Sequence, residues 1–190
     1  MILGNKLVCA NLGDARAVLS RNGKALDLSV DYKASRKDEQ ERIKSQGGYI
    51  VFGRVLGRLA VTRAFGDFDC KQIQITNEET KQVEEHNFVL NEPEIRVVSL
   101  DPVIDDFIVL ASDGLFDRFS SQECITKTRE HLMSQEMMEQ DPKDAARVLV
   151  AEATSSRINS DNTTCVIVTL NRGIDKSKAE MEKNNLTSSC

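Results

Sequence analysis

The sequence has few of the residues on which membrane, zinc and disulfide-rich proteins depend. It contains 2 histidines, no tryptophan and no apolar run that approaches the ~20 residues of a membrane-spanning helix. Two histidines exclude a zinc site built on several histidine ligands. The 5 cysteines are dispersed and form no C-x-x-C pair, which is typical of free thiols in a reducing compartment. We therefore expect an intracellular domain, cytoplasmic and/or nuclear, with no membrane partner.

Basic residues are also in the minority. Lys and Arg total 25 against 30 Asp and Glu, which gives a formal net charge of −5. Because binding to a phosphate backbone depends on clustered Lys and Arg, and the sequence has no basic block, we expect no nucleic acid partner. A length of 190 residues suits a single domain that buries roughly 70% of its unfolded surface.

Short strands and turns occupy the first 30 residues. Three strands are predicted, at residues 6–11, 15–20 and 24–28. A Gly13-Asp14 turn follows the first strand, and Asn22-Gly23, a dipeptide typical of tight hairpins, follows the second. The meander begins almost at Met1, although an open sheet edge is normally paired or covered. We interpret this as a sign that N-terminal structure is missing.

Helices are predicted where capping signals precede helix-forming stretches. They cover residues 35–46, 120–138 and 141–153. Ser35 with Asp38 gives the S-x-x-D pattern of a helix start. Ser120 with Glu123 resembles a capping box, and Pro142 stands at a first helical position.

The remaining strands come in groups. Two short strands are predicted within residues 49–64, and longer ones at residues 95–100, 107–111 and 166–170. Residues 107–111 are almost continuously apolar, which predicts a central, buried strand. Since strands and helices do not alternate singly, a doubly wound sheet is not favoured. We predict an α+β fold, an antiparallel β-sandwich flanked by helices and incomplete at the N-terminus. It occupies residues 1–170, and residues 171–190 form a polar tail.

Four aspartates stand at the ends of buried strands or just before them. They are Asp14, Asp113, Asp117 and Asp161. A turn aspartate commonly bonds nearby backbone N–H groups, which explains any one of them alone. Asp113 and Asp117, however, lie four residues apart around one turn. At ~5 Å and an effective dielectric constant of ~20, two such charges repel by roughly 3 kcal/mol. A cluster of this kind takes up protons, stays hydrated or holds a cation.

The ligand chemistry limits the choice of cation. Oxygen ligands without Cys or His favour Mg²⁺ or Mn²⁺, and Ca²⁺ less. A hydrated divalent ion held by carboxylates at strand ends suits phosphoryl chemistry, because the metal activates water and screens phosphate oxygens.

The motifs of competing chemistries are absent. The sequence has no G-x-x-x-x-G-K-[ST], G-x-G-x-x-G or G-x-S-x-G motif, and no C-x5-R loop. A Ser/His/Asp triad would need His86, within the polar and irregular residues 71–90, or His131, in the middle of a helix. We expect both histidines at the surface.

Four motifs in order resemble the metal-dependent Ser/Thr protein phosphatases of type 2C. They are LVCANLGDARAVLSRNGKAL (7–26), GRVLGRLAVTRAFGDFD (53–69), DDFIVLASDGLFD (105–117) and SDNTTCVIV (160–168). The resemblance extends from Leu7 to about Leu170, the C-terminal two-thirds of such a domain. It implies two packed antiparallel sheets with helices outside, and hydrolysis of phosphate from phosphoprotein substrates.

The resemblance also implies a role for each acidic residue. Asp113 and Asp161 would be direct ligands of one ion of a Mg²⁺ or Mn²⁺ pair. Asp14 would belong to a weaker third-metal site, and Asp117 would help to hold the metal-bound waters.

Other residues of the motifs would support this site. Asn162 would support Asp161, and Gly114 completes the family's D-G motif. Arg63 lies where the family has an arginine near the substrate groove. Residues 69–90 would form the family's variable flap beside the active site, a position suited to substrate choice.

One part of the family pattern is missing. The D-G-H-x-G motif, whose Asp bridges both metals and whose His is the general acid, does not occur, and neither does the upstream phosphate-binding Arg. D-G occurs only at Asp113-Gly114, where leucine follows. We therefore expect no catalytic residue in this chain and an incomplete two-metal site. The chain is then a truncated or fragment form, or a second chain completes the fold.

Two other interpretations remain open. A catalytically inactive, phosphatase-like regulatory protein would bind partners or targets through the flap and helices without hydrolysing them. A calcium-binding structural module would use the same carboxylates, but the sequence has no D-x-D-x-D-G loop.

Overall fold

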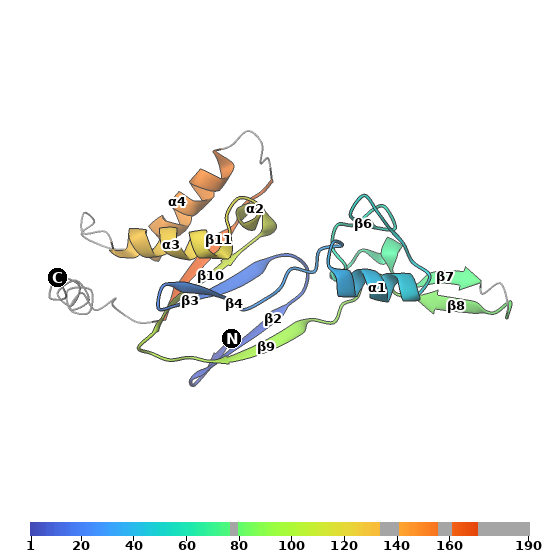
Figure 1. The fold of residues 1–190 in the computed structure, drawn as a ribbon, viewed down its shortest axis with the longest axis horizontal. Coiled ribbons are helices and arrows are strands. Elements are labelled where there is room, and N and C mark those ends of the chain that lie inside the picture. Colours follow the sequence, from blue (N-terminus) through green and yellow to red (C-terminus); the bar gives the residue numbers. More distant parts are fainter. Residues whose placement is uncertain (77–79, 134–140, 156–160, 171–190) are drawn as a thin grey trace, which may run out of the picture. The chain divides into compact units, whose positions relative to one another are not determined.

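The computed structural model of the chain describes residues 1–76, 80–133, 141–155 and 161–170 (Figure 1). The strands are β1 (Ile2–Leu3), β2 (Lys6–Asn11), β3 (Arg16–Arg21), β4 (Lys24–Asp27), β5 (Ile50–Val51), β6 (Arg54–Val55), β7 (Ile73–Thr76), β8 (Val83–His86), β9 (Glu94–Ser99), β10 (Asp105–Ala111) and β11 (Cys165–Thr169). The helices are α1 (Lys37–Ser45), α2 (Asp113–Phe116), α3 (Ser121–Met133) and α4 (Pro142–Thr154), with a 3₁₀ turn at Phe68–Cys70. The predicted end of α3 near residue 138 and the predicted tail 171–190 lie outside the described residues.

The chain divides into two compact units. Unit 1 comprises residues 1–17 and 28–99, and unit 2 comprises residues 18–27 and 100–190. Unit 1 contains the sheet β1-β2-β9, the hairpins β5–β6 and β7–β8, and α1. Unit 2 contains α2, α3 and α4 and nearly all of the sheet β11-β10-β3-β4. The pairs β2–β9, β3–β4 and β10–β11 are antiparallel, which confirms the predicted α+β class built on antiparallel sheets.

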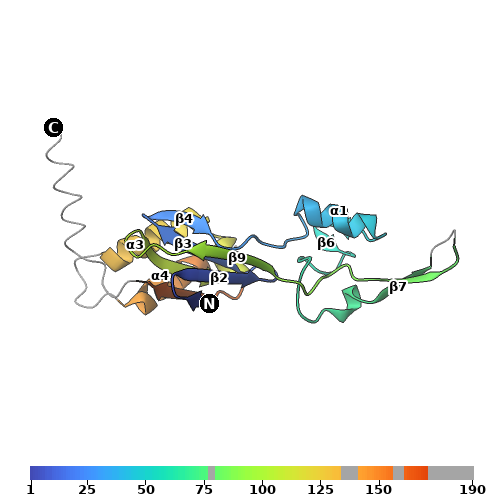
Figure 2. The ribbon, with the colours of Figure 1, turned by 90° about the horizontal axis from the view of Figure 1, so that it is seen from below.

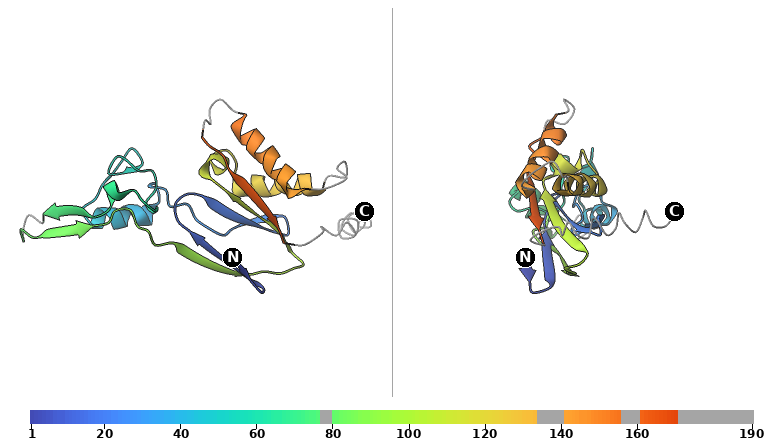
Figure 3. Two further views of the ribbon diagram at one scale, coloured as in Figure 1. Left: turned by 180° about the vertical axis from the view of Figure 1, so that it is seen from behind. Right: turned by 90° about the vertical axis from the view of Figure 1, so that its left-hand side faces the viewer.

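The core of unit 2 lies between its sheet and its helices. Figures 1 and 3 show α3 and α4 on one face of this sheet. β10 lies between β11 and β3, and its residues Phe107 and Val109 are fully buried, which confirms the predicted central strand. Leu115 of α2, Ile125 of α3 and Leu149 of α4 belong to the same apolar cluster. This cluster anchors α2 at the end of β10, and α2 begins with Asp113.

The first two predicted strands form but do not pair with each other. β2 pairs with β1 and β9, whereas β3 lies between β4 and β10. The predicted meander is therefore wrong at this step, because the chain leaves one sheet after β2 and joins another at β3. Gly13, at φ +91°, provides the left-handed backbone in this connection. The predicted Asn22-Gly23 hairpin is confirmed, with both residues at positive φ, as a type I′ turn requires.

Two of the three predicted helix starts are confirmed. The amide and hydroxyl of Ser120 both donate to Oε2 of Glu123, and α4 begins at Pro142, as predicted. The Asp141 side chain also accepts a hydrogen bond from the Lys143 amide at this start. The Ser35 cap is wrong. In the part of the chain that the structure describes, α1 begins after Arg36 and no side chain caps it, while the Asp38 carboxylate pairs with the Arg36 guanidinium at 2.9 Å.

The predicted flap, residues 69–90, contains a regular element that the sequence did not suggest. β7 and β8 pair in antiparallel register from Ile73↔His86 to Thr76↔Val83, and Figure 2 shows this hairpin extending away from α1. Its inner side is anchored, because Ile73 and Ile75 pack on the unit 1 cluster that contains the buried Phe88. The prediction of irregular chain is wrong because the two apolar residues among many polar ones gave too weak a strand pattern.

Two findings concern membranes and disulfides. In the part of the chain that the structure describes, no helix has the length and apolar character needed to cross a bilayer.

Among the described residues the cysteines form no disulfide. Burial raises the pKa of the Cys165 thiol to about 11, so this thiol stays protonated at neutral pH.

Candidate functional site

The segments that carry Asp113 and Asp161 meet beside the end of β10. Since β10 and β11 are antiparallel, with Ala111 opposite Cys165, the end of β10 lies beside the start of β11. The Ser112 hydroxyl donates to the Asn162 carbonyl oxygen at 3.2 Å, and the Thr164 amide donates to the Ser112 hydroxyl at 3.1 Å. The residue before Asp113 is thus bonded to the residue after Asp161.

Gly114 allows this close approach. A Cβ atom at this position would lie 2.7 Å from the Asn162 carbonyl oxygen and 2.7 Å from Oγ1 of Thr163. Any larger residue would have to displace backbone, because one of the two atoms is a main-chain oxygen. The glycine is therefore required by space rather than by its own backbone angles, and it brings the two aspartate segments together.

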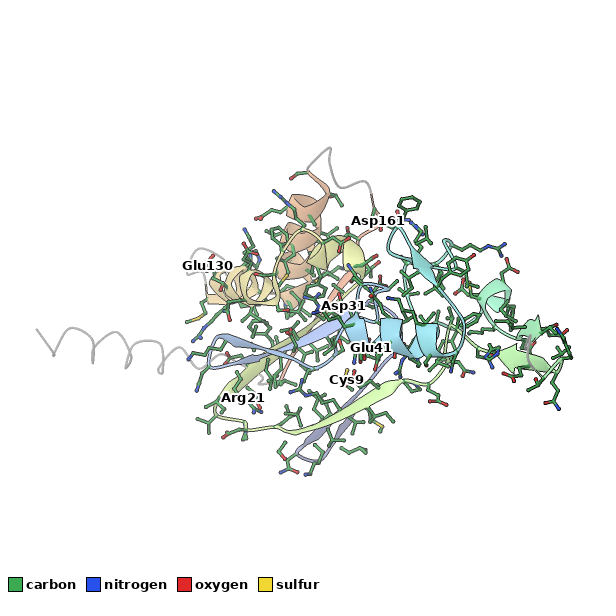
Figure 4. The ribbon with its side chains drawn as sticks, turned by 45° about the vertical axis from the view of Figure 1, so that its right-hand side comes forward. Cys9, Arg21, Asp31, Glu41, Glu130 and Asp161 are labelled. Carbon is green, nitrogen blue, oxygen red and sulfur yellow. The ribbon has the colours of Figure 1, made fainter. Side chains whose placement is uncertain are left out.

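Both aspartates also make the hydrogen bonds expected of turn residues. Oδ1 of Asp113 accepts from the Gly114 amide at 2.9 Å, and Oδ1 of Asp161 accepts from the Asn162 amide at 2.7 Å. Asp113 is half-buried at the start of α2, and Asp161 is exposed where the chain approaches β11 (Figure 4). Asp117 is exposed at the C-terminal end of α2, where its amide donates to the Asp113 carbonyl at 2.7 Å.

The donor set suits a hydrated hard cation. Within the described residues, no group of three or more His, Cys, Asp or Glu side chains is arranged to hold a metal ion. Mg²⁺ commonly keeps several waters and is held by one or two carboxylates together with substrate phosphates. The two carboxylates of Asp113 and Asp161, from bonded neighbouring segments, fit that kind of site.

Asp14 belongs to unit 1, whereas the other three predicted metal ligands belong to unit 2. It is half-buried and follows the buried Gly13. Its place in a third-metal site stays a prediction.

Arg63 is held in unit 1 by several contacts. Its Nη2 atom donates to Oε1 of Glu39 at 3.0 Å, and its Nη1 atom donates to the Glu92 carbonyl at 3.0 Å. Its guanidinium lies 4.0 Å from the centroid of the Tyr32 ring, while the Arg36 guanidinium lies 4.3 Å from the same centroid. Within the described ranges of the chain, the Arg63 Nε atom is buried and has no hydrogen-bond partner. Arg63 thus has a fixed orientation.

Glu39 was not predicted from the sequence, although its carboxylate binds two arginines. It is 3% exposed on α1, and its second oxygen, Oε2, accepts from Nη2 of Arg42 at 2.8 Å. Burial by itself would raise its pKa, but the hydrogen bonds from Arg42 and Arg63 outweigh it and lower the pKa to about 2. The E-x-x-R spacing in α1 is the sequence signal that could have pointed to this pair.

The chain is thus an α+β protein with antiparallel sheets, in which two aspartate-bearing segments meet beside the end of β10. The family model for protein phosphatase 2C matches residues 1–163. The chain therefore belongs to the protein phosphatase 2C family, and the resemblance seen in its motifs is confirmed.

Relatives are found in plants. The chain is 38% identical over 192 residues to "Probable protein phosphatase 2C 69" of Arabidopsis thaliana, covering 100% of this chain and 46% of the relative. It is also 38% identical over 171 residues to "Probable protein phosphatase 2C 45" of Oryza sativa subsp. japonica, covering 88% of this chain and 52% of the relative. The chain thus spans about half the length of these relatives.

Solved structures agree with this family. A phosphatase from a pathogenic strain of Toxoplasma gondii superposes with a TM-score of 0.66 at 27% identity, over 86% of this chain and 47% of that one. A sex-determining protein of C. elegans gives a TM-score of 0.69 at 24% identity, over 88% of this chain and 37% of that one. At this identity the second match shows the fold alone.

Proposed function

We propose that this chain is part of a metal-dependent protein phosphatase that hydrolyses phosphoserine and phosphothreonine esters. The observation that carries the proposal is the hydrogen bond of 3.2 Å from the Ser112 hydroxyl to the Asn162 carbonyl oxygen. This bond brings the segments of Asp113 and Asp161 together. Membership of the protein phosphatase 2C family supports it.

In this proposal Asp113 and Asp161 hold a Mg²⁺ or Mn²⁺ ion. When bound, the ion lowers the pKa of a coordinated water and neutralises charge on the phosphate. Asp113 and Asp161 supply carboxylate oxygens, and the amides of Gly114 and Asn162 orient these carboxylates through the bonds described above. Asp117 would accept hydrogen bonds from waters on the bound ion, and Asn162 would support Asp161.

Two further residues complete the assignment within this chain. Asp14 contributes to a weaker third-metal site. Arg63 faces the substrate groove, where its orientation is set by Glu39 and Tyr32. The general acid and the phosphate-binding arginine of the family are not in this sequence, so another segment or a second chain supplies them.

The alternative is a regulatory protein that binds phosphatase partners or targets and hydrolyses nothing. The junction of the Asp113 and Asp161 segments favours the enzyme over this alternative. We propose that the chain is present here as a truncated or fragment form of the enzyme.

Release of phosphate from a phosphothreonine peptide tests the proposal. In a protein that contains this chain together with the segment or second chain that supplies the general acid, we expect Mn²⁺-dependent turnover that Asp113→Asn abolishes. Asp144→Asn is the matched control, since Asp144 lies on α4 and pairs with Arg147 across one turn of that helix. Turnover that is equal in the two variants would reject Asp113 as a ligand. Peptide binding with no Mn²⁺-dependent turnover would favour the regulatory protein.

A further inference from the structure

The Glu39 carboxylate connects α1 to the flap through two arginines that it binds. Each of its oxygens receives a different arginine, Oε1 from Arg63 at 3.0 Å and Oε2 from Arg42 at 2.8 Å. At 3% exposed, the carboxylate is taken out of water, so these two charged partners are what keeps it ionised.

Both arginines also donate hydrogen bonds to residues 87–92, the return segment by which the chain leaves the flap and rejoins the unit 1 core. Nη2 of Arg42 donates to the Phe88 carbonyl at 3.0 Å, and Nη1 of Arg42 donates to the Asn87 carbonyl at 3.4 Å. Nη1 of Arg63 donates to the Glu92 carbonyl at 3.0 Å. One carboxylate therefore fixes main-chain oxygens at two places on the return segment.

The start of the flap, at residues 70–72, is hydrogen-bonded to the same return segment. The Val89 amide donates to the Cys70 carbonyl at 3.3 Å, and the Gln72 amide donates to Oδ1 of Asn87 at 3.0 Å. These bonds tie the two ends of the hairpin β7–β8 together. Movement of residues 87–92 would therefore carry the whole hairpin with it.

We propose that Glu39 is a positioning residue, which sets the orientation of the flap through Arg42 and thereby determines how tightly a phosphoprotein substrate binds. The substrate part of this inference rests on the proposed function, whereas the anchoring of the flap rests on the contacts above. Arg42 is the decisive residue because it donates to the carbonyls of residues 87 and 88, whereas Arg63 donates to the carbonyl of Glu92. A substitution at Arg42 therefore tests the effect of the flap contacts apart from the effect of Arg63, the arginine proposed to face the substrate groove.

The experiment compares Arg42→Lys and Glu39→Gln with the wild-type chain. Lysine at position 42 keeps a charge for Glu39 but cannot also reach the carbonyls of residues 87 and 88. Glu41→Gln is the matched control, because Glu41 is exposed on the same helix (Figure 4). Hydrogen exchange of the amides in residues 83–90 is measured first, without metal or substrate. Anisotropy of a labelled phosphothreonine peptide in EDTA then gives Kd without hydrolysis.

We expect about tenfold faster exchange in residues 83–90 for Arg42→Lys, and an increase in the peptide Kd of about fivefold to tenfold. Glu39→Gln gives at least the same effects, and Glu41→Gln gives neither. If Glu39→Gln does not fold, the result for Arg42→Lys decides alone.

Each other outcome has a definite meaning. Unchanged exchange in Arg42→Lys overturns the anchoring, whatever the activity of the chain. Faster exchange with an unchanged Kd overturns the connection to substrate binding. A weakened Kd in Glu39→Gln alone assigns the effect to Arg63 and also overturns the inference. If the wild-type chain binds the peptide with the expected pattern but binds no Mn²⁺, the proposed function fails and the inference holds.

Discussion

Ser112 and Asn162 are joined by a hydrogen bond of 3.2 Å from the Ser112 hydroxyl to the Asn162 carbonyl oxygen. The same hydroxyl accepts from the Thr164 amide at 3.1 Å, so one side chain closes a loop between two segments that are distant in sequence. Asp113 and Asp161 are the direct neighbours of the bonded pair. The geometry of a metal site at this point therefore depends on groups that are not themselves ligands.

Gly114→Ala tests how much this junction depends on space. The new Cβ atom would lie 2.7 Å from the Asn162 carbonyl oxygen, so the segment of Asp161 must move. We expect a loss of about 1–3 kcal/mol in the free energy of unfolding, as for other overpacked sites, and weaker Mn²⁺ binding.

Urea unfolding and Mn²⁺ titration measure these two effects. The control is Gly4→Asn, where a Cβ atom meets nothing within 4 Å and asparagine tolerates the left-handed backbone. Gly114→Ala with the stability and Mn²⁺ affinity of the wild type would mean that the junction is not close-packed.

A buried ion pair in unit 2 predicts acid sensitivity. Asp105 is 1% exposed and accepts two hydrogen bonds from Arg21, at 2.7 and 2.9 Å. Burial opposes ionisation of this carboxyl, but the bonds from Arg21 and from the Asp101 amide outweigh it and lower its pKa. The ionised form is therefore stabilising above the ordinary pKa of an aspartate, and this stability is lost as the pH falls through the folded-state pKa.

We expect Asp105→Asn to reduce the free energy of unfolding at pH 7 by about 2–4 kcal/mol, because the Arg21 charge loses its partner. The comparison is Asp144→Asn, which breaks the exposed pair with Arg147 and should cost less than about 1 kcal/mol. Equal losses in the two variants, measured by thermal and urea unfolding, would show that burial of Asp105 does not matter.

Glu39 gives a second pH dependence, in unit 1. Its pKa of about 2, against an ordinary 4.5, means that the folded state favours the ionised carboxylate. The stability from Glu39 is fully present above pH ~4.5 and is lost between that pH and about 2. We expect it to be roughly 2–3 kcal/mol, less than the pKa difference alone implies, because both arginines are partly exposed.

Unfolding of the wild type and Glu39→Gln between pH 2 and pH 7 measures this contribution. The two curves should converge as the pH falls toward 2. A constant difference between them across this range would show that the ionisation of Glu39 is not coupled to folding.

β9 predicts association between chains. Among the described residues β9 pairs only with β2, and its alternate residues Ile95 and Val97 are 64% and 56% exposed. An apolar edge strand is a template for pairing with another chain. We expect concentration-dependent association in light scattering, reduced by Val97→Lys on β9. The control is Val103→Lys, because Val103 is 63% exposed but lies outside any strand. Equal behaviour of the two variants would exclude β9 as the contact.

The elements with strong local signals could be predicted from the sequence. The apolar run of β10, the Asn22-Gly23 turn and the capping box at Ser120 each determine structure through neighbouring residues, and each is present in the structure. The ordered motifs also identified the family correctly.

The errors arose where long-range contacts decide the structure. Nothing near Gly13 in sequence shows that the next strand joins another sheet, because the partners of β3 include β10, which lies far along the chain. Glu39 was missed for the same reason. Its second arginine comes from position 63, and its burial depends on how α1 packs. Ser112 could be seen only as a turn residue until its bond to Asn162 was known.

The most direct test of the account is calorimetric titration of the wild-type chain, Asp113→Asn and Asp161→Asn with Mn²⁺. The account predicts saturable binding to the wild type that both substitutions abolish. It also predicts about 2.7 kcal/mol of added unfolding free energy for the wild type at 100 times its dissociation constant. Wild-type chain that binds no Mn²⁺, or variants that bind it as well as the wild type does, would contradict the assignment of these two aspartates.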